Sequence, residues 1–222
     1  LFDLPNLPAA GGLVRAAAEG GLRMTPPPKP QLEEKLWFAL FWMRPLREFW
    51  RRELGERHWL ALQRVFPRTW LLDPAPLPHH AVIPDLDIQS WTELGGFSQR
   101  DRQLVLKVSG FSERAWGSRG VVVGSDLPHA EWSRAIEEAL AAFPTGPWIL
   151  QRFHPTRLVE HPRHESGSVR RFRGRVRLCP YSFLEEDGSA TLRGALATLV
   201  PADKKLIHGM RDAVLVPGAV RD

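Results

Sequence analysis

The chain has 222 residues, of which 43% are hydrophobic, so it can bury the core of one large domain or about one and a half ordinary ones. Its formal charge of +5 and its pI near 10.0 would attract nucleic acid, a membrane surface or nucleotide phosphates, and composition does not choose among these polyanions. The single cysteine, Cys179, excludes an intramolecular disulfide and a multi-cysteine zinc site and favours a reducing compartment, with the cytoplasm as the expected location.

The longest strongly apolar patch, residues 36–43, spans about eight residues, whereas a bilayer-spanning helix needs about 20. We therefore expect no membrane association, and no secretory signal is visible. The chain begins at Leu1 rather than Met, which is consistent with a piece of a longer protein.

Three segments follow one another in the expected organisation. Residues 1–30 are rich in Pro, Gly and Ala and predict an extended N-terminal linker that ends in the stiff segment TPPPKP. Residues 31–100 predict a helical region whose helices are aromatic on one side and Arg-rich on the other. A plain amphipathic layer packed on a sheet is favoured there over a lid or a partner-binding face. Residues 101–222 are expected to form the main domain, called the core below.

A stretch from Leu104 to Gly124, LVLKVSGFSERAWGSRGVVVG, predicts a strand, a Gly/Ser/Arg-rich loop and a second strand. Lys107 ends the first apolar run and is the only lysine between Lys35 and Lys204. A lysine is a compact charge suited to phosphate oxygens, and glycines let backbone N–H groups turn toward a ligand. The stretch therefore predicts a hairpin over an anion; a surface hairpin with a solvated lysine is the alternative.

The segments after this hairpin complete a mixed pattern. Asp126 and Pro128 give a capping signal for a helix that ends near Phe143, and the apolar run PWILQRF at 147–153 predicts a buried strand. Strand, loop, strand, helix and strand together predict an α+β (mixed α/β) fold with packed helices. Antiparallel pairing is expected later as well, in a hairpin with its turn at Asp187-Gly188.

The segment HPTRLVEHPRHES at 154–166 offers histidines and glutamates as metal ligands, since His161 and His164 have an i, i+3 spacing. Pro162 disfavours the helix that this spacing would need, so we expect a solvated turn instead.

Four arginines alternate along VRRFRGRVRL at 169–178 and would share one face of a strand. They repel each other unless an anion or an acidic partner meets them, so they are a second candidate anion-binding element. A basic, solvated edge strand that resists aggregation is the alternative.

The run LVLKVSGFSERAWGSRGVVVG, followed by a helix and by WILQRF at 148–153, resembles the nucleotide-binding core of the ATP-grasp superfamily, nearest to its circularly permuted, glutathionylspermidine-synthase-like members. KPQLEEKLWFAL at 29–40 and FPRTWLLDP at 66–74 look like the region that precedes that core. The resemblance covers about two thirds of the chain. It implies an ATP-grasp-like fold and a carboxylate–amine ligase, which uses ATP and Mg²⁺ to activate a small-molecule or peptide carboxylate as an acyl phosphate for attack by an amine.

The resemblance also implies roles for particular residues. Lys107 would contact the phosphates, and the loop from Ser109 to Gly120 would close over them. Backbone groups of the linker Gln151–Phe153 would read the adenine edge, and Arg175 and Arg177 would neutralise phosphate charge as the catalytic arginines. The cofactor-binding set that follows is Lys107, Ser109, Gly110, Ser112, Gly117, Arg119, Gly120, Gln151, Arg152 and Phe153.

One departure concerns magnesium. Family members hold the metal with a carboxylate and a Glu-x-Asn pair on late strands, but Asn6 is the only asparagine in this chain. The metal ligands are therefore not identified: they lie outside this sequence, or the order is permuted, or catalysis has been lost. Two other functions stay open, a nucleotide-binding pseudo-enzyme and a non-catalytic basic module for nucleic acid. The second is less favoured, because the aromatic residues do not interleave with the arginines, where they could stack on bases.

Overall fold

The computed structural model describes residues 7–24, 26–27, 29–115, 117–209 and 212–218. The chain forms two compact units, residues 30–154 and residues 1–29 together with 155–222. Residues 31–100 share the first unit with residues 101–154, and this unit ends at His154.

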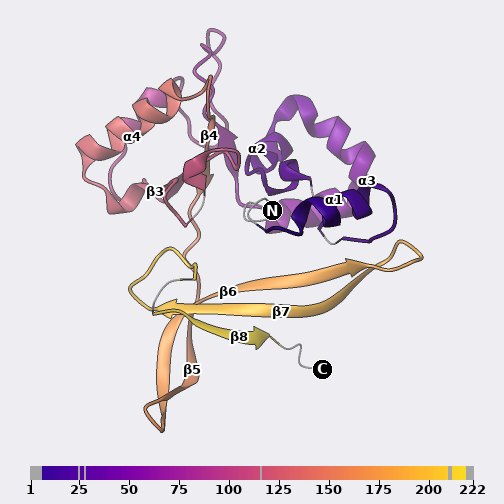
Figure 1. Ribbon diagram of the computed structural model, residues 1–222. Coiled ribbons are helices and arrows are strands. Elements are labelled where there is room, and N and C mark those ends of the chain that lie inside the picture. The colour runs from indigo at the N-terminus through magenta and orange to yellow at the C-terminus, as the bar shows by residue number, and fades with distance from the viewer. Residues whose placement is uncertain (1–6, 25, 28, 116, 210–211, 219–222) are drawn as a thin grey trace. The chain divides into compact units, whose positions relative to one another are not determined.

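The unit of residues 30–154 is built on one antiparallel sheet with the strand order β1-β4-β2-β3. Figure 1 labels the strands β3 and β4 of this sheet and the helices α2, α3 and α4 of the same unit. Its strands are β1 (Thr69–Leu71), β2 (Leu104–Val108), β3 (Val121–Val123) and β4 (Trp148–Arg152). Its α-helices are α2 (Leu36–Trp42), α3 (Arg47–Val65) and α4 (His129–Ala141). Short 3₁₀ helices are η2 (Pro30–Glu33), η3 (Arg44–Leu46), η4 (Trp91–Gly96), η5 (Glu113–Ala115) and η6 (Gly124–Asp126).

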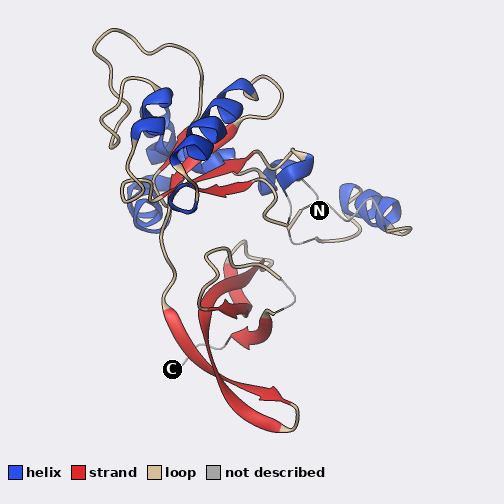
Figure 2. Ribbon diagram, turned by 90° about the vertical axis from the view of Figure 1, so that its left-hand side faces the viewer, coloured by secondary structure: helices blue, strands red, loops and turns tan. Residues whose placement is uncertain are grey.

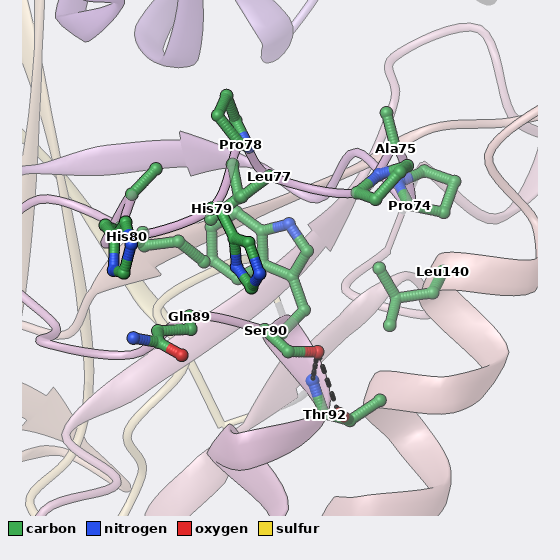
Figure 3. Close-up of a pocket in the computed structure, with 14 residues that line it drawn as sticks. Pro74, Ala75, Leu77, Pro78, His79, His80, Gln89, Ser90, Thr92 and Leu140 are labelled. Carbon is green, nitrogen blue, oxygen red and sulfur yellow. Dashed lines mark hydrogen bonds between the residues drawn. The ribbon is translucent and has the colours of Figure 1, made fainter.

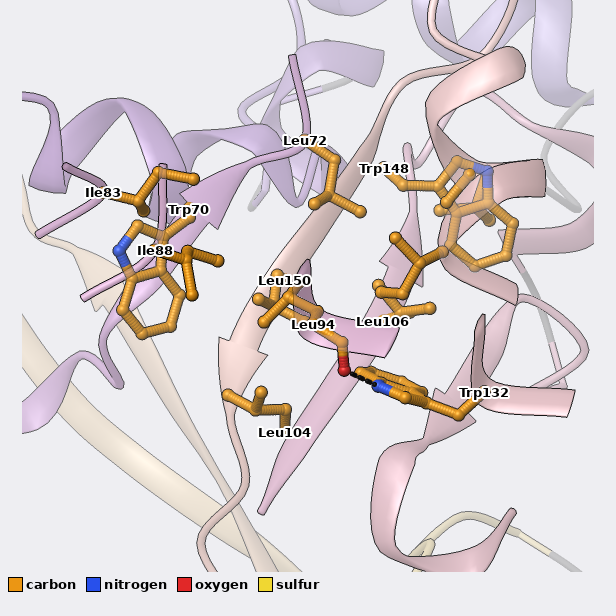
Figure 4. Close-up of a cluster of buried hydrophobic side chains, with 13 residues drawn as sticks. Trp70, Leu72, Ile83, Ile88, Leu94, Leu104, Leu106, Trp132, Trp148 and Leu150 are labelled. Atoms are coloured by element: carbon orange, nitrogen blue, oxygen red, sulfur yellow. Dashed lines mark hydrogen bonds between the residues drawn. The ribbon is translucent and has the colours of Figure 1, made fainter. Parts of the chain in front are cut away.

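One face of this sheet packs against α4 and η4 and forms the main core (Figure 4). Strand alternation places Leu104 and Leu106 of β2 on this face, where they meet the fully buried Trp132 of α4. The Trp132 Nε1–H donates to the carbonyl oxygen of Leu94 at 2.8 Å, so the one polar atom of the ring is satisfied. Each fully buried leucine of this kind stabilises the fold by about 2 kcal/mol.

Residues of the opposite parity form the second face of the sheet, which α2 partly covers at β1. This face carries polar residues within an apolar setting: Thr69, Lys107 and Gln151 alternate with the buried Val105 and Ile149. A buried polar set on a sheet face needs internal hydrogen bonds, so this face is where a functional site is expected.

The second unit carries helix α1 (Ala10–Ala18) and an antiparallel sheet with the order β5-β6-β7-β8. Its strands are β5 (Leu158–Glu165), β6 (Ser168–Leu184), β7 (Ala190–Pro201) and β8 (Val214–Gly218). From residue 155 onward the described chain contains strands and loops but no helix (Figure 2). The β6–β7 hairpin turns at Asp187-Gly188, as the sequence predicts. The expected α+β class with antiparallel sheets is confirmed.

Three local expectations need correction. Residues 158–165 form strand β5 rather than a solvated turn; β5 is an edge strand, where Pro162 is tolerated although it lacks an N–H. The N-cap residue of helix α4 is Pro128, which makes no side-chain cap bond, rather than Asp126. Strand β8 in the C-terminal segment was not predicted. It forms by pairing with β7, and a local sequence pattern does not show such a contact between distant segments.

Candidate functional site

The centre of the candidate site is the β2–β3 hairpin predicted from the sequence. Strands β2 and β3 pair in antiparallel fashion, with Lys107 opposite Val121, and the loop 109–120 joins them. Lys107 is the one charged residue of β2, and its side chain is half-buried. Since Lys107 is diagonal to Gln151 across the β2–β4 pair, the two side chains lie on the same face of the sheet.

A chain of hydrogen bonds starts at this lysine and crosses three strands. Lys107 Nζ donates to Gln151 Oε1 at 2.6 Å, and Gln151 Nε2 donates to Thr69 Oγ1 at 2.9 Å. The Thr69 hydroxyl in turn donates to the carbonyl oxygen of Pro67 at 2.8 Å. Gln151 and Thr69 are only 5% and 1% exposed, so the sheet holds the amide oxygen in place toward the ammonium group.

A second lysine lies beside the first. Lys35 Nζ donates to the carbonyl oxygens of Val108 at 3.2 Å and of Ala115 at 3.4 Å. Burial lowers the pKa of Lys107 below its ordinary value, and the positive charge of Lys35 lowers it further. Burial also lowers the pKa of Lys35, and the charge of Glu34 acts against this effect. Within the described chain, both ammonium groups donate to neutral oxygens only.

The carboxylate of Glu34 fixes the start of the loop. It is 9% exposed, and it accepts hydrogen bonds from Ser109 Oγ at 2.5 Å, from the Gly110 amide at 3.1 Å and from the Leu36 amide at 2.9 Å. Each donor would otherwise be buried without a partner. Residues 34–36 therefore hold the hairpin loop at its base, 75 residues away in sequence.

Two glycines of the loop are required by close approach. A Cβ added at Gly110 would lie 2.6 Å from the carbonyl oxygen of Glu33, and one added at Gly120 would lie 2.7 Å from that of Arg114. Both distances are too short for any other residue, because the atoms they meet are backbone. These glycines serve the packing of the loop against its own base.

The remaining loop residues bond within the loop. Ser112 Oγ accepts from the Arg114 amide at 3.2 Å, and Arg119 Nη2 donates to the carbonyl oxygen of Glu113 at 3.1 Å. Gly117 is exposed and has a φ of 62°. Phe111 is 66% exposed, an unusual position for a large apolar ring in a loop. Trp116 lies outside the described residues.

The predicted linker Gln151–Phe153 coincides with the end of β4, and the side chains of its first two residues lie on opposite faces of the sheet. Gln151 points to the lysine face, whereas Arg152 belongs to the opposite parity, and its Nη2 donates to the carbonyl oxygen of Asp85 at 3.0 Å. The Phe153 amide donates to the carbonyl oxygen of Gln103 at 2.9 Å. The structure thus brings Lys107, Ser109, Gly110, Gly120 and Gln151 together and directs the side chain of Arg152 elsewhere.

The two predicted catalytic arginines belong to the other unit, on β6. The half-buried Arg175 donates through Nε to the carbonyl oxygen of Ala202 at 2.9 Å and through Nη1 to that of Thr156 at 2.6 Å. Arg177 is exposed and lies opposite the buried Thr198 of β7. Arg175 therefore ties loop backbone to the sheet, and Arg177 stays accessible.

No group of three or more His, Cys, Asp or Glu side chains that could hold a metal occurs among the residues that the structure describes. His161 and His164 are three residues apart on β5, so they point to opposite faces of the sheet and cannot chelate one ion. None of the helices among the described residues is long and apolar enough to cross a bilayer.

Lys107 lines none of three cavities found among the described residues of the unit 30–154. The one shown in Figure 3 has a volume of about 420 Å³ and lies between the Pro74–Ala81 segment, η4 and Leu140. His79 and His80 stack at its wall with ring centroids 5.2 Å apart, and Ser90 Oγ lies 2.9 Å from Thr92 Oγ1. These side chains are exposed and bond to each other, so the lysine face remains the better candidate site.

Comparison of the chain with models of protein families, with curated proteins and with solved structures gave no match in any of the three. Function is therefore inferred from the chain's own residues.

Three residues of the site were missed by sequence reasoning, namely Glu34, Lys35 and Thr69. They lie in the segments 29–40 and 66–74, which resemble the region before an ATP-grasp core, but no local pattern gives them a role. The scarcity of lysine, the signal that singled out Lys107, applies equally to Lys35, since the chain has five lysines against 25 arginines.

Proposed function

We propose that the chain binds ATP, with the phosphates held by Lys107 and Lys35 beside the 109–120 loop, and that it serves a carboxylate–amine ligase of the ATP-grasp type. The observation that carries the proposal is the pair of half-buried ammonium groups, whose acceptors among the described residues are all neutral oxygens. Two such charges close together repel each other, and an anion would relieve that repulsion.

The donors at the start of the loop are already engaged, because Ser109 Oγ and the Gly110 amide donate to Glu34 and the Phe111 amide donates to Ser109 Oγ. The two lysines therefore carry the contact with a phosphate. Positioning and charge neutralisation are what phosphoryl transfer mainly demands of a protein. ATP arrives with its own Mg²⁺, and no metal ligand is assigned to this chain.

The test is calorimetric titration of the protein with Mg-ATP. We expect measurable affinity for the wild type and a loss of about 10- to 100-fold for Lys107→Met, the range expected for a charge-assisted contact to phosphate. The matched control is Lys204→Met, which removes an exposed lysine that pairs with Asp203 and should bind like the wild type. Equal affinities for wild type and Lys107→Met, or no binding by a folded wild type, would overturn the proposal.

A second measurement separates ATP binding from general attraction to polyanions. Since the pKa values of both lysines are lowered, an anion that stabilises their charged forms should cause proton uptake on binding in the pH range around the lowered pKa values. Titrations in buffers with different ionisation enthalpies detect this uptake. Ligase activity itself is tested by release of ADP that depends on both a carboxylic acid and an amine; ATP binding without such release would leave a pseudo-enzyme.

A further inference from the structure

A cavity of about 360 Å³ at the β1 side of the unit 30–154 differs in character from the lysine site. Tryptophans from three elements line it: Trp42 of α2, Trp70 of β1 and Trp91 of η4. We refer to it as the tryptophan cavity. Its volume falls in the range of small-molecule sites, and aromatic walls are typical of such sites.

The three indole rings are fixed in place. The Nε1–H groups donate to the carbonyl oxygens of Pro67, Pro84 and Asp73, at 2.9, 2.9 and 3.0 Å respectively. Trp70 also packs into the main core (Figure 4). The cavity is therefore formed before any ligand arrives, which lowers the entropic cost of binding.

Apolar side chains at the mouth of the cavity are exposed. Met43, Leu77 and Val82 are 37%, 41% and 48% exposed, and all three line the tryptophan cavity. A ligand with an apolar body would cover them and gain from their removal from water.

Arg68 gives the cavity its polar group. Its guanidinium lies 4.8 Å from the ring centre of Trp42 and 5.7 Å from that of Trp70. Its Nε pairs with Asp85 Oδ2 at 2.7 Å, and neither Nη nitrogen donates a hydrogen bond within the described residues. The side chain is 20% exposed, so this guanidinium has donors to offer and little water to receive them.

Positive side chains outnumber negative ones in the cavity lining. Arg44 and Arg68 line it with one acidic residue, Asp73, whose carboxylate accepts from the Ala75 amide at 2.9 Å, and Asp85 pairs with Arg68 from outside the lining. A carboxylate could take both Nη donors of Arg68 in the bidentate arrangement that guanidinium groups prefer.

We propose that the tryptophan cavity binds a small carboxylic acid with an aromatic body, its carboxylate on Arg68 and its ring among the tryptophans. The inference does not depend on nucleotide binding at Lys107. Thr69 lines this cavity and also accepts from Gln151, so the two sites share one wall, and the test must separate them.

The probes are 3-phenylpropionate and its uncharged counterpart 3-phenylpropan-1-ol, each titrated by calorimetry into the whole chain. We expect the wild type to bind the acid at least about tenfold more tightly than the alcohol. Arg68→Met should keep the affinity for the alcohol and lose the preference for the acid. Arg64→Met, an exposed arginine of α3 outside the cavity lining, should leave both affinities unchanged.

A second variant covers the case in which Arg68→Met fails to fold. Val82→Glu places a negative charge at the exposed mouth and should weaken binding of the acid by about tenfold or more. The matched change Val65→Glu, on a residue of α3 that is 71% exposed, should have no effect. Equal affinity of the wild type for acid and alcohol, or no binding of either, would overturn the proposal. So would loss of acid binding in Lys107→Met, because the acid would then occupy the lysine site.

Discussion

Two regions of the molecule carry several positive charges: the lysine face, formed by Lys107 and the neighbouring Lys35, and the arginine strand β6. The charges differ in their burial and in their partners. In the unit of residues 30–154, Lys107 of the sheet and Lys35 beside α2 are half-buried and donate to neutral oxygens, and the charge of Lys35 lowers the pKa of Lys107. On β6, Arg171 pairs with Glu160 at 3.0 Å and Arg175 donates to two loop carbonyls, while Arg177 extends into solvent.

This difference shows that the number of charges does not decide where an anion binds. An exposed ion pair such as Arg171–Glu160 contributes little to stability and is screened by salt. Burying a cation without an ion pair to a carboxylate costs free energy, because the cation loses contact with water. A bound anion recovers part of this cost. The lysine face is therefore the stronger candidate, although the arginine strand is the more conspicuous pattern in the sequence.

The largest effect is expected at Glu34, which holds the lysine face together. Glu34→Ala leaves Ser109 Oγ and the amides of Gly110 and Leu36 without their acceptor, which should lower the free energy of unfolding by about 3 kcal/mol. Urea unfolding at neutral pH measures the loss. Glu34→Gln keeps one acceptor oxygen and should lose less; if both variants unfold like the wild type, Glu34 does not hold the loop.

A smaller effect is expected on the arginine strand, and it should be uneven. Arg175→Ala removes two hydrogen bonds to the carbonyls of Thr156 and Ala202 and should cost about 1–2 kcal/mol in the free energy of unfolding. Arg177→Ala, two residues along the same strand, should leave the melting temperature unchanged. Thermal unfolding of both variants decides; equal losses would mean that the strand responds to charge rather than to these two bonds.

The smallest expected effect is the pH dependence of the free energy of unfolding that Lys107 causes. Because the pKa of Lys107 is lowered from its ordinary value of 10.5, the unfolded chain binds more protons between the lowered pKa and 10.5, and stability rises with pH through that window. At neutral pH the full cost of the buried charge is present, so Lys107→Met should be as stable as the wild type or more stable by about 1 kcal/mol.

Urea unfolding of both proteins from about pH 7 to about pH 10 measures this difference, which should shrink as pH rises. Parallel stability curves would show that Lys107 is solvated like an ordinary surface lysine, and the contrast with the arginine strand would then disappear.

Local patterns were enough to predict most of the fold. Alternation and turn residues correctly gave the hairpin at Lys107, the buried strand at 148–152 and the turn at Asp187-Gly188. Strand β5 could not be predicted in this way, because its His- and Pro-containing sequence has weak β propensity and becomes a strand by pairing with β6.

The candidate site was predictable only on the side contributed by the hairpin. Lys107 and the glycines of its loop are marked by type and order, but Glu34 and Lys35 reach the loop from more than 70 residues away. The local sequence gives Thr69 no role beyond that of a strand residue. Only the register of β1 against β4 places it directly opposite Gln151. Contacts of this range follow from the packing of α2 and β1 on the sheet, which no local pattern encodes.

The bonds from residues 34 and 35 to the hairpin also bear on the order of folding. The β2–β3 hairpin closes over a short loop, whereas the Glu34–Ser109 contact closes a much longer one and carries a larger entropic cost. The strands should therefore form early, and the lysine face should be completed only when the segment before α2 docks. In a refolding experiment the capacity to bind an anion should return after the tryptophan fluorescence of the core has recovered.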